Sequence, residues 1–180
     1  MNVENMNREF LDKVLRGETE DHWYHFGITS TDPALHALRD VQAVIVAGSG
    51  ERTAKFASDW ASRRNAEVVS FPKEDRFVLR YADRVLFSSL GMGMPSAAIA
   101  MHELMKMTYF LKNGDTEKLD KIFWMRVGTS GGVGLPGGAV VVSTAALLPD
   151  LKPYRVFVQG KDHYFPGQYP HSIAVELVHL

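Results

Sequence analysis

Residues 126–132 read Arg-Val-Gly-Thr-Ser-Gly-Gly, and they overlap the end of an apolar run from Ile122 to Val127. The run predicts a buried strand that ends near its arginine and opens into a glycine-rich turn. A guanidinium, two hydroxyl groups and closely approaching backbone N–H groups together suit a small oxyanion such as phosphate. In open α/β sheets, ligands bind beyond the carboxyl ends of the strands, where this turn is expected. The stretch therefore indicates an anion site; the alternative is a strand and a flexible turn with Arg126 in solvent.

The composition is that of one globular domain with a sizeable core. The chain has 180 residues, 46% hydrophobic and 23% charged, and we treat residues 1–20 as an N-terminal helix and linker of a single domain. A net charge of −1 argues against a nucleic-acid or membrane partner, which would select a basic surface. The lack of cysteine excludes disulfides and thiolate metal sites. Without a signal-peptide pattern or an apolar run of membrane-spanning length, a cytoplasmic protein is expected.

Predicted strands and helices alternate along the chain, which indicates the α/β class. Apolar runs predict strands over residues 41–46, 68–71, 77–81, 85–89, 122–127, 137–144 and 154–159. Helical spacing predicts helices over residues 10–15, 51–63, 95–113 and 171–180. The methionines between residues 92 and 107 are interpreted as core filling. The last helical pattern stops without a capping residue, which indicates a truncated domain.

A second glycine-rich stretch, Gly48-Ser-Gly-Glu-Arg52, follows a predicted strand and opens a predicted helix. A helix N-terminus is a favourable place for an anion. Thr53 stands where a dinucleotide fingerprint has its third glycine, and the Lys-Ser/Thr pair of a P-loop is missing, so neither NAD nor ATP chemistry is indicated. Arg52 and Arg126 can each bind phosphate oxygens bidentately, and Arg76 is a possible third. The alternative for Arg52 is an ordinary surface charge.

Six segments occur in an order and spacing shared with a known family. They are Tyr24-His-Phe26, Gly48-Ser-Gly-Glu-Arg52, Asp75-Arg-Phe77, Leu90-Gly-Met-Gly-Met-Pro-Ser96, His102-Glu-Leu-Met-Lys106 and Arg126-Val-Gly-Thr-Ser-Gly-Gly-Val-Gly134. From about Tyr24 to Leu180 the chain resembles the nucleoside phosphorylases, in particular the uridine phosphorylases of animal type. The resemblance implies a three-layer α/β/α sandwich around a mixed central sheet, here incomplete on its C-terminal side.

The resemblance also implies reversible phosphorolysis of uridine to uracil and ribose 1-phosphate, in pyrimidine nucleoside salvage and catabolism. Inorganic phosphate is then a co-substrate, with no metal and no cofactor. Clamped by arginines, it would attack C1′ as the glycosidic bond loosens. By this resemblance, phosphate is bound by Gly48, Arg52, Arg76, Arg126 and Thr129, with Arg52 and Arg126 catalytic, and the nucleoside by His25, Thr129, Ser130 and Gly131.

Two of these residues imply a second subunit. By the resemblance, Arg76 reaches a neighbour's phosphate and His25 reaches a neighbour's ribose 5′-hydroxyl. The expected partners are therefore a nucleoside, phosphate and a second copy of the chain in a homodimer with shared active sites.

The sequence also departs from the family. Active members carry a later Gln and Arg that contact the uracil edge, and a Glu-Met-Glu run that grips the ribose; neither is present. The segment Phe165-Pro-Gly-Gln168 only mimics the uracil-reading loop, because Pro170 stands in place of the arginine. We therefore expect the 180-residue chain to be inactive by itself.

Several alternatives stay open. The chain could be a non-catalytic relative that binds phosphate or dimerises, or a purine or methylthioadenosine member of the same superfamily. A remote alternative is a serine hydrolase, because residues 128–132 match Gly-x-Ser-x-Gly, although no helix is predicted to follow. His102 and Glu103 resemble part of a zinc-protease helix, but Lys106 replaces the second histidine, so the pair is interpreted as a solvated helix face.

Overall fold

A computed structural model of the chain describes residues 3–71, 76–131, 134–143, 155–158, 160–164 and 174–179. The backbone groups into two compact units, Met1–Phe123 and Trp124–Leu180, and each is described by itself. The organisation of the whole chain as a single domain stays a prediction. In the described part of the chain, no helix has the length and apolar character needed to cross a membrane.

The first unit contains all the helices of the described residues. Its helices are α1 (Val3–Leu15), η1 (Tyr24–Phe26), η2 (Pro33–Leu38), α2 (Gly50–Arg64), α3 (Met94–Leu111) and α4 (Thr116–Leu119). Its strands are β1 (His22–Trp23), β2 (Ile28–Thr29), β3 (Ala43–Ala47), β4 (Val69–Ser70), β5 (Leu79–Ala82) and β6 (Val85–Ser89). β1 and β2 form a small antiparallel pair, and the other four strands are neighbours in one sheet.

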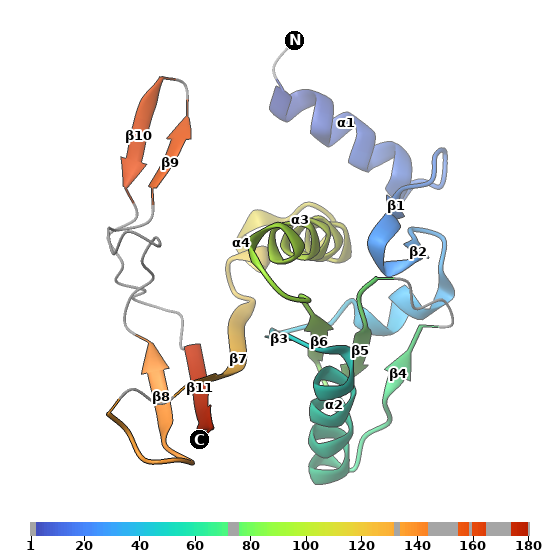
Figure 1. The fold of residues 1–180 in the computed structure, drawn as a ribbon. Helices are drawn as coiled ribbons and strands as arrows, with labels where there is room; N and C mark the ends of the chain where they lie inside the picture. The colour runs from blue at the N-terminus through green and yellow to red at the C-terminus, as the bar shows by residue number, and fades with distance from the viewer. Residues whose placement is uncertain are drawn as a thin grey trace. The chain divides into compact units, whose positions relative to one another are not determined.

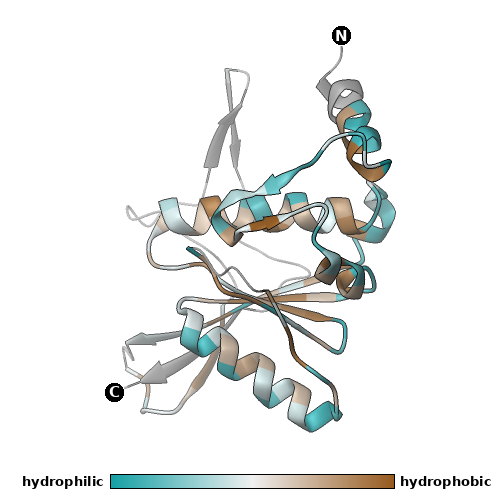
Figure 2. Cartoon of the chain, turned by 90° about the vertical axis from the view of Figure 1, so that its right-hand side faces the viewer, coloured by the Kyte–Doolittle hydropathy of each residue, from teal (hydrophilic) through white to brown (hydrophobic). Residues whose placement is uncertain are grey.

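This sheet is mixed and lies between two helices. Its order is β4-β5-β6-β3, with β3 parallel to β6 and the other neighbours antiparallel. Figures 1 and 2 show α3 on one side of the sheet and α2 on the other, so three layers are present within this unit. Phe87 packs against Ala57 and Ala61 of α2. On the other face of β6, Leu86 is fully buried, as are Leu104 and Met107 of α3. The α/β class and the mixed sheet are confirmed.

Helix ends follow local sequence signals. Ser49 caps α2, and Asn65 ends it in the left-handed conformation at φ 53°. Pro95 lies in the first turn of α3, where its missing N–H costs nothing. Asn113 and Gly114 follow α3 with φ of 54° and 70°. The predicted helices over residues 51–63 and 95–113 are therefore confirmed with small shifts at their ends.

Among its described residues, the second unit contains strands and no helix. They are β7 (Phe123–Gly131), β8 (Val140–Ser143), β9 (Arg155–Val158), β10 (Lys161–Tyr164) and β11 (Ala174–His179). β11 lies between β7, to which it is parallel, and β8, to which it is antiparallel. β9 and β10 form an antiparallel hairpin in which Gly160 has a φ of 77°.

Two predictions in this unit are wrong. The glycine-rich turn expected after Val127 does not form, because β7 continues through Gly131 and pairs there with β11. The helix expected over residues 171–180 is a strand at Ala174–His179, because pairing on both sides satisfies its backbone groups. Over so few residues, apolar spacing does not distinguish a helix from a buried strand.

The methionines in and just before α3 were predicted to fill the core, and only some of them do. The buried stripe of the helix runs through Ala100, Leu104, Met107 and Leu111, at helical spacing. Met107 is therefore core, as expected. The prediction is wrong for Met92, Met94 and Met105, which are 92%, 65% and 54% exposed, because they lie before or beside the stripe.

Candidate functional site

The stretch Gly48-Ser-Gly-Glu-Arg52 forms the turn between β3 and α2, called here the first glycine turn. The hydroxyl of Ser49 accepts the backbone N–H of Arg52 at 3.3 Å, and its carbonyl accepts the N–H and the hydroxyl of Thr53 at 3.1 and 2.9 Å. Arg52 is half-buried in the first turn of the helix. A helix N-terminus carries a partial positive charge, so this turn combines a favourable field with a guanidinium.

A second glycine turn lies directly beside the first. β3 and β6 are parallel, so both end at the same edge of the sheet, and the N–H of Leu90 donates to the carbonyl of Ala47 at 2.8 Å. A Cβ atom at Gly48 would lie 3.9 Å from the carbonyl oxygen of Gly91. At Gly91 only glycine fits, because φ is +69° and a Cβ would lie 2.4 Å from the Ser96 hydroxyl. The turns that lead into α2 and α3 therefore meet at one edge.

Residues 76–78 complete this edge of the first unit. Val78 packs against Gly50, where an added Cβ would lie 2.5 Å from its Cγ2. The buried ring of Phe77 lies 3.7 Å from the position of a Cβ at Gly91. Arg76 is exposed, with its guanidinium carbon 5.4 Å from the centroid of the Phe77 ring. An exposed Arg76 beside the glycine turns is compatible with the expected reach toward a neighbour, which stays a prediction.

His25 is held by α3 and by residues 76–77. Glu103 accepts the backbone N–H of His25 at 3.0 Å and contacts its ring Nδ1 at 2.7 Å. The His25 carbonyl accepts the N–H groups of Arg76 and Phe77, both at 3.1 Å. His25 and Arg76, the two residues expected to serve a neighbouring subunit, are therefore joined through their backbones.

The interpretation of Glu103 as part of a solvated helix face is wrong. Its side chain is only 15% exposed and is bound to His25. Ala100 and Met107, one turn before and one turn after it, are fully buried. This helical spacing was the sequence signal that could have placed Glu103 at the inner edge of α3.

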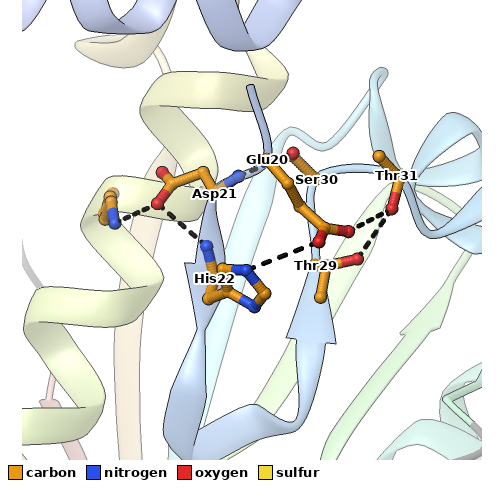
Figure 3. Close-up of polar contacts among 7 residues, drawn as sticks. Glu20, Asp21, His22, Thr29, Ser30 and Thr31 are labelled. Atoms are coloured by element: carbon orange, nitrogen blue, oxygen red, sulfur yellow. Dashed lines mark hydrogen bonds and ion pairs between the residues drawn. The ribbon is translucent and has the colours of Figure 1, made fainter. Parts of the chain in front are cut away.

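A second contact ties the His25 segment to α3 one turn further along. The Asp21 carboxylate accepts a hydrogen bond from the ammonium group of Lys106 at 2.6 Å. The backbone N–H of Asp21 donates to the Ser30 hydroxyl at 3.0 Å. Figure 3 shows Asp21 within a group of polar side chains on β1, β2 and their flanking residues. There Glu20 accepts the Thr31 hydroxyl, which lowers the pKa of this carboxyl group. The two bonds of Asp21 hold the short hairpin whose connection, η1, carries His25.

The second unit carries the other predicted site residues on β7. Arg126, Gly128 and Ser130 share one face of the strand by alternation, and Thr129 and Gly131 share the other. The Arg126 side chain is exposed and lies over Gly128, where a Cβ atom would meet its guanidinium at 3.2–3.3 Å. Glycine at 128 thus gives the guanidinium room to lie along the strand.

The serine hydrolase geometry is not formed. A nucleophile elbow places its serine on a sharp turn between a strand and a helix. Ser130 instead lies within β7, paired with Val178 of β11, and the described residues that follow, 134–139, are not helical.

The predicted site is thus distributed over the two units. The first brings Gly48, Arg52, Arg76 and His25 onto adjoining segments, and the second holds Arg126, Thr129, Ser130 and Gly131. Their convergence on one phosphate and one nucleoside stays a prediction. Gln168 and Pro170 lie outside the described residues. Within the described ranges, no three or more carboxylate and histidine side chains gather as a metal site would require.

The chain matches one protein family over most of its length. Residues 42–180 match the family model of the phosphorylase superfamily. The chain belongs to the phosphorylase superfamily. Within it the chain is uridine phosphorylase-like, which confirms the resemblance seen in the sequence.

The similar proteins include uridine phosphorylases and one relative that is named as inactive. Uridine phosphorylase A and an inactive uridine phosphorylase B, both of Schistosoma mansoni, are each 34% identical over 143 residues, which cover 76% of this chain and 45% of the relative. A crystal structure of uridine phosphorylase from Schistosoma mansoni in complex with thymine has a TM-score of 0.67 at 33% identity, over 83% of this chain and 51% of that one. Other structures of uridine phosphorylase from that organism are complexes with uracil and thymidine. The chain spans about half the length of these relatives.

Proposed function

We propose that this uridine phosphorylase-like chain acts in the reversible phosphorolysis of uridine to uracil and ribose 1-phosphate; the expected inactivity of the 180 residues by themselves is the second candidate below. One observation carries the proposal: two glycine turns, each leading into a long helix, meet at the carboxyl ends of parallel strands, with Arg52 in the first helical turn. That arrangement favours an inorganic anion. The complexes of Schistosoma mansoni uridine phosphorylase with uracil and thymidine support a pyrimidine nucleoside as second substrate.

The chemistry needs little from the protein beyond placement and charge. As the bond from C1′ to the uracil N1 lengthens, C1′ gains positive character, and a phosphate oxygen forms the new bond on that carbon. The electron pair of the broken bond leaves with uracil, which takes a proton. Arg52 and Arg126 would hold the phosphate next to the developing cation, so that attack is effectively intramolecular.

The remaining roles follow the same proposal. Gly48 and Thr129 would donate further hydrogen bonds to phosphate, while Ser130 and Gly131 would lie along the nucleoside. Arg76 and His25 would act in the site of a second copy, which makes the active form a homodimer.

The experiment measures two quantities on the purified chain. The first is the melting temperature across a phosphate titration, with chloride at matched ionic strength as the control. The second is uracil release from uridine with and without phosphate, with inosine and methylthioadenosine as rival substrates. A phosphate-dependent rise in melting temperature together with phosphate-dependent uracil release supports the proposal. A melting curve that phosphate does not move contradicts it.

A second candidate is a relative that binds phosphate without catalysis. The observation favouring it is that the inactive uridine phosphorylase B is as similar to the chain as uridine phosphorylase A. In this case phosphate still raises the melting temperature, but no uracil is released. The two measurements therefore separate the candidates.

A further inference from the structure

We propose that Glu103 is a positioning residue of the nucleoside site, which holds the His25 imidazole in its Nδ1-protonated tautomer and so leaves Nε2 as a hydrogen-bond acceptor for a substrate hydroxyl. The substrate part of this inference rests on the proposed function. The tautomer part rests on geometry within the first unit and can be tested separately.

The carboxylate of Glu103 determines where the imidazole proton lies. It contacts two nitrogen atoms of one residue, the backbone N–H of His25 at 3.0 Å and the ring Nδ1 at 2.7 Å. An ionised carboxylate only accepts hydrogen bonds, so Nδ1 must be the donor. In the neutral imidazole the other ring nitrogen, Nε2, then carries a lone pair and accepts.

The other polar and aromatic contacts of His25 leave its ring little freedom. Its carbonyl is bound by the N–H groups of Arg76 and Phe77. Its ring packs edge-on against Tyr24 and tilted against Phe77, with centroid distances of 5.5 and 6.3 Å. The contact of Lys106 with Asp21 restrains the same segment one helical turn along α3.

Nε2 is the polar atom of His25 that these contacts leave available. Among the described residues it has no hydrogen-bond partner, and the side chain is 33% exposed. Carboxylate groups orient imidazoles in this way where the far nitrogen has a ligand, whether a metal or a substrate. A sugar hydroxyl can donate to such an acceptor, which deepens the role expected of His25.

The tautomer is tested by nitrogen-15 NMR of the imidazole rings in the 180-residue chain. Spectra are recorded as the pH is raised until the His25 signals stop moving, and the signals are assigned by their loss in His25→Gln. The expected result is a protonated Nδ1 and an unprotonated Nε2. Glu103→Gln keeps the side-chain volume, but its amide can accept the backbone N–H while donating to Nδ1. This variant is expected to move the proton to Nε2.

A matched control removes another carboxylate of the same segment. Glu20 contacts Nε2 of His22 at 3.4 Å, so Glu20→Gln is the same chemical change beside a different histidine. It is expected to leave the His25 signals unchanged. A proton on Nε2 of His25 in the unchanged chain overturns the inference, as does a Glu103→Gln spectrum in which the His25 tautomer is the same.

The substrate part is tested by comparing uridine with 5′-deoxyuridine, which lacks the hydroxyl. Glu103→Gln is expected to reduce the preference in kcat/KM for uridine over 5′-deoxyuridine by roughly three- to ten-fold, the value of one neutral hydrogen bond. Glu20→Gln leaves that preference unchanged. An unchanged preference in Glu103→Gln overturns the substrate part. If the unchanged chain cleaves neither nucleoside, the proposed function fails, and the tautomer measurement decides the role of Glu103.

Discussion

Gly50 and Val78 are in direct contact: a Cβ atom at Gly50 would lie 2.5 Å from Cγ2 of Val78. Gly50 is the first residue of α2, and Val78 immediately precedes β5. The glycine is therefore required where the helix packs against the segment that carries Arg76 and Phe77. Gly48, two residues earlier, has more room, since its nearest contact would be a carbonyl oxygen at 3.9 Å. Gly50 is thus needed for packing against Val78, whereas the packing at Gly48 leaves room for a side chain.

The first prediction compares the effect on stability of an alanine at Gly50 with that of an alanine at Gly48. Gly50→Ala should lower the free energy of unfolding by about 1–3 kcal/mol, because Val78 is β-branched and cannot swing its methyl group away without strain. Gly48→Ala should stay within about 0.5 kcal/mol of the unchanged chain, since its Cβ fits. Urea denaturation measures both. The double variant Gly50→Ala with Val78→Ala should recover part of the loss, and strictly additive effects would contradict direct contact.

The second prediction concerns Arg52 as a phosphate ligand. Phosphate at 100 times its Kd should stabilise the unchanged chain by about 2.7 kcal/mol. Arg52→Ala should lose most of this gain, and Arg52→Lys should keep only part, because an ammonium group cannot bind two oxygens in one plane. Arg63→Ala, an exposed change in the last turn of the same helix, is the control and should keep the full gain. An equal phosphate effect in Arg52→Ala would place the anion elsewhere.

Local signals made the first unit predictable, and long-range pairing made the second unit hard to predict. Ser49 and Asn65 define the ends of α2 through bonds within a few residues, so sequence placed that helix almost correctly. β11 is a strand because β7 and β8, distant in the chain, pair with it on both sides. The same pairing keeps Gly131 in β7, where a turn was expected. Only tertiary structure supplies that information.

The residues of the candidate site also fall into those that a local sequence pattern predicts and those that depend on a distant partner. The glycine turns and Arg52 could be predicted, because a turn between a strand and a helix has a local sequence pattern. Glu103 was missed because its role depends on His25, 78 residues away. Its position between buried turns of α3 was visible in the sequence, but the identity of its partner was not.

The third prediction tests the position of the Arg126 guanidinium over Gly128. Gly128→Ala should weaken phosphate binding by roughly three- to ten-fold, because its Cβ would push the guanidinium off the strand, loosening one charge-assisted hydrogen bond. Gly131→Ala, in the same strand, meets nothing within 4 Å and should bind phosphate normally. Isothermal titration with phosphate measures both. Equal weakening in the two variants would mean that the strand, and not the arginine, responds.

The last prediction uses Tyr81, whose hydroxyl donates to Asp40 from a buried position. Burial, and then the hydrogen bond to Asp40, raise the pKa of Tyr81 above its ordinary value of 10.0. In the folded chain Tyr81 therefore keeps its proton at a pH where the unfolded chain has begun to lose it. The stability that this proton provides is complete below pH 10 and falls as the pH rises above it.

Tyr81→Phe should cost about 0.5–1.5 kcal/mol at neutral pH, the value of one hydrogen bond, since the exposed Asp40 can return to water. Above pH 10 the difference between the two proteins should shrink, because only the unchanged chain loses the contribution of this proton. Urea denaturation between pH 7 and pH 11 measures the difference directly. Tyr24→Phe, at a side chain that is 75% exposed, is the control and should parallel the unchanged chain across the range. A difference for Tyr81→Phe that grows with pH would mean that the phenol is more acidic in the folded state, contrary to the burial and hydrogen bond described for it.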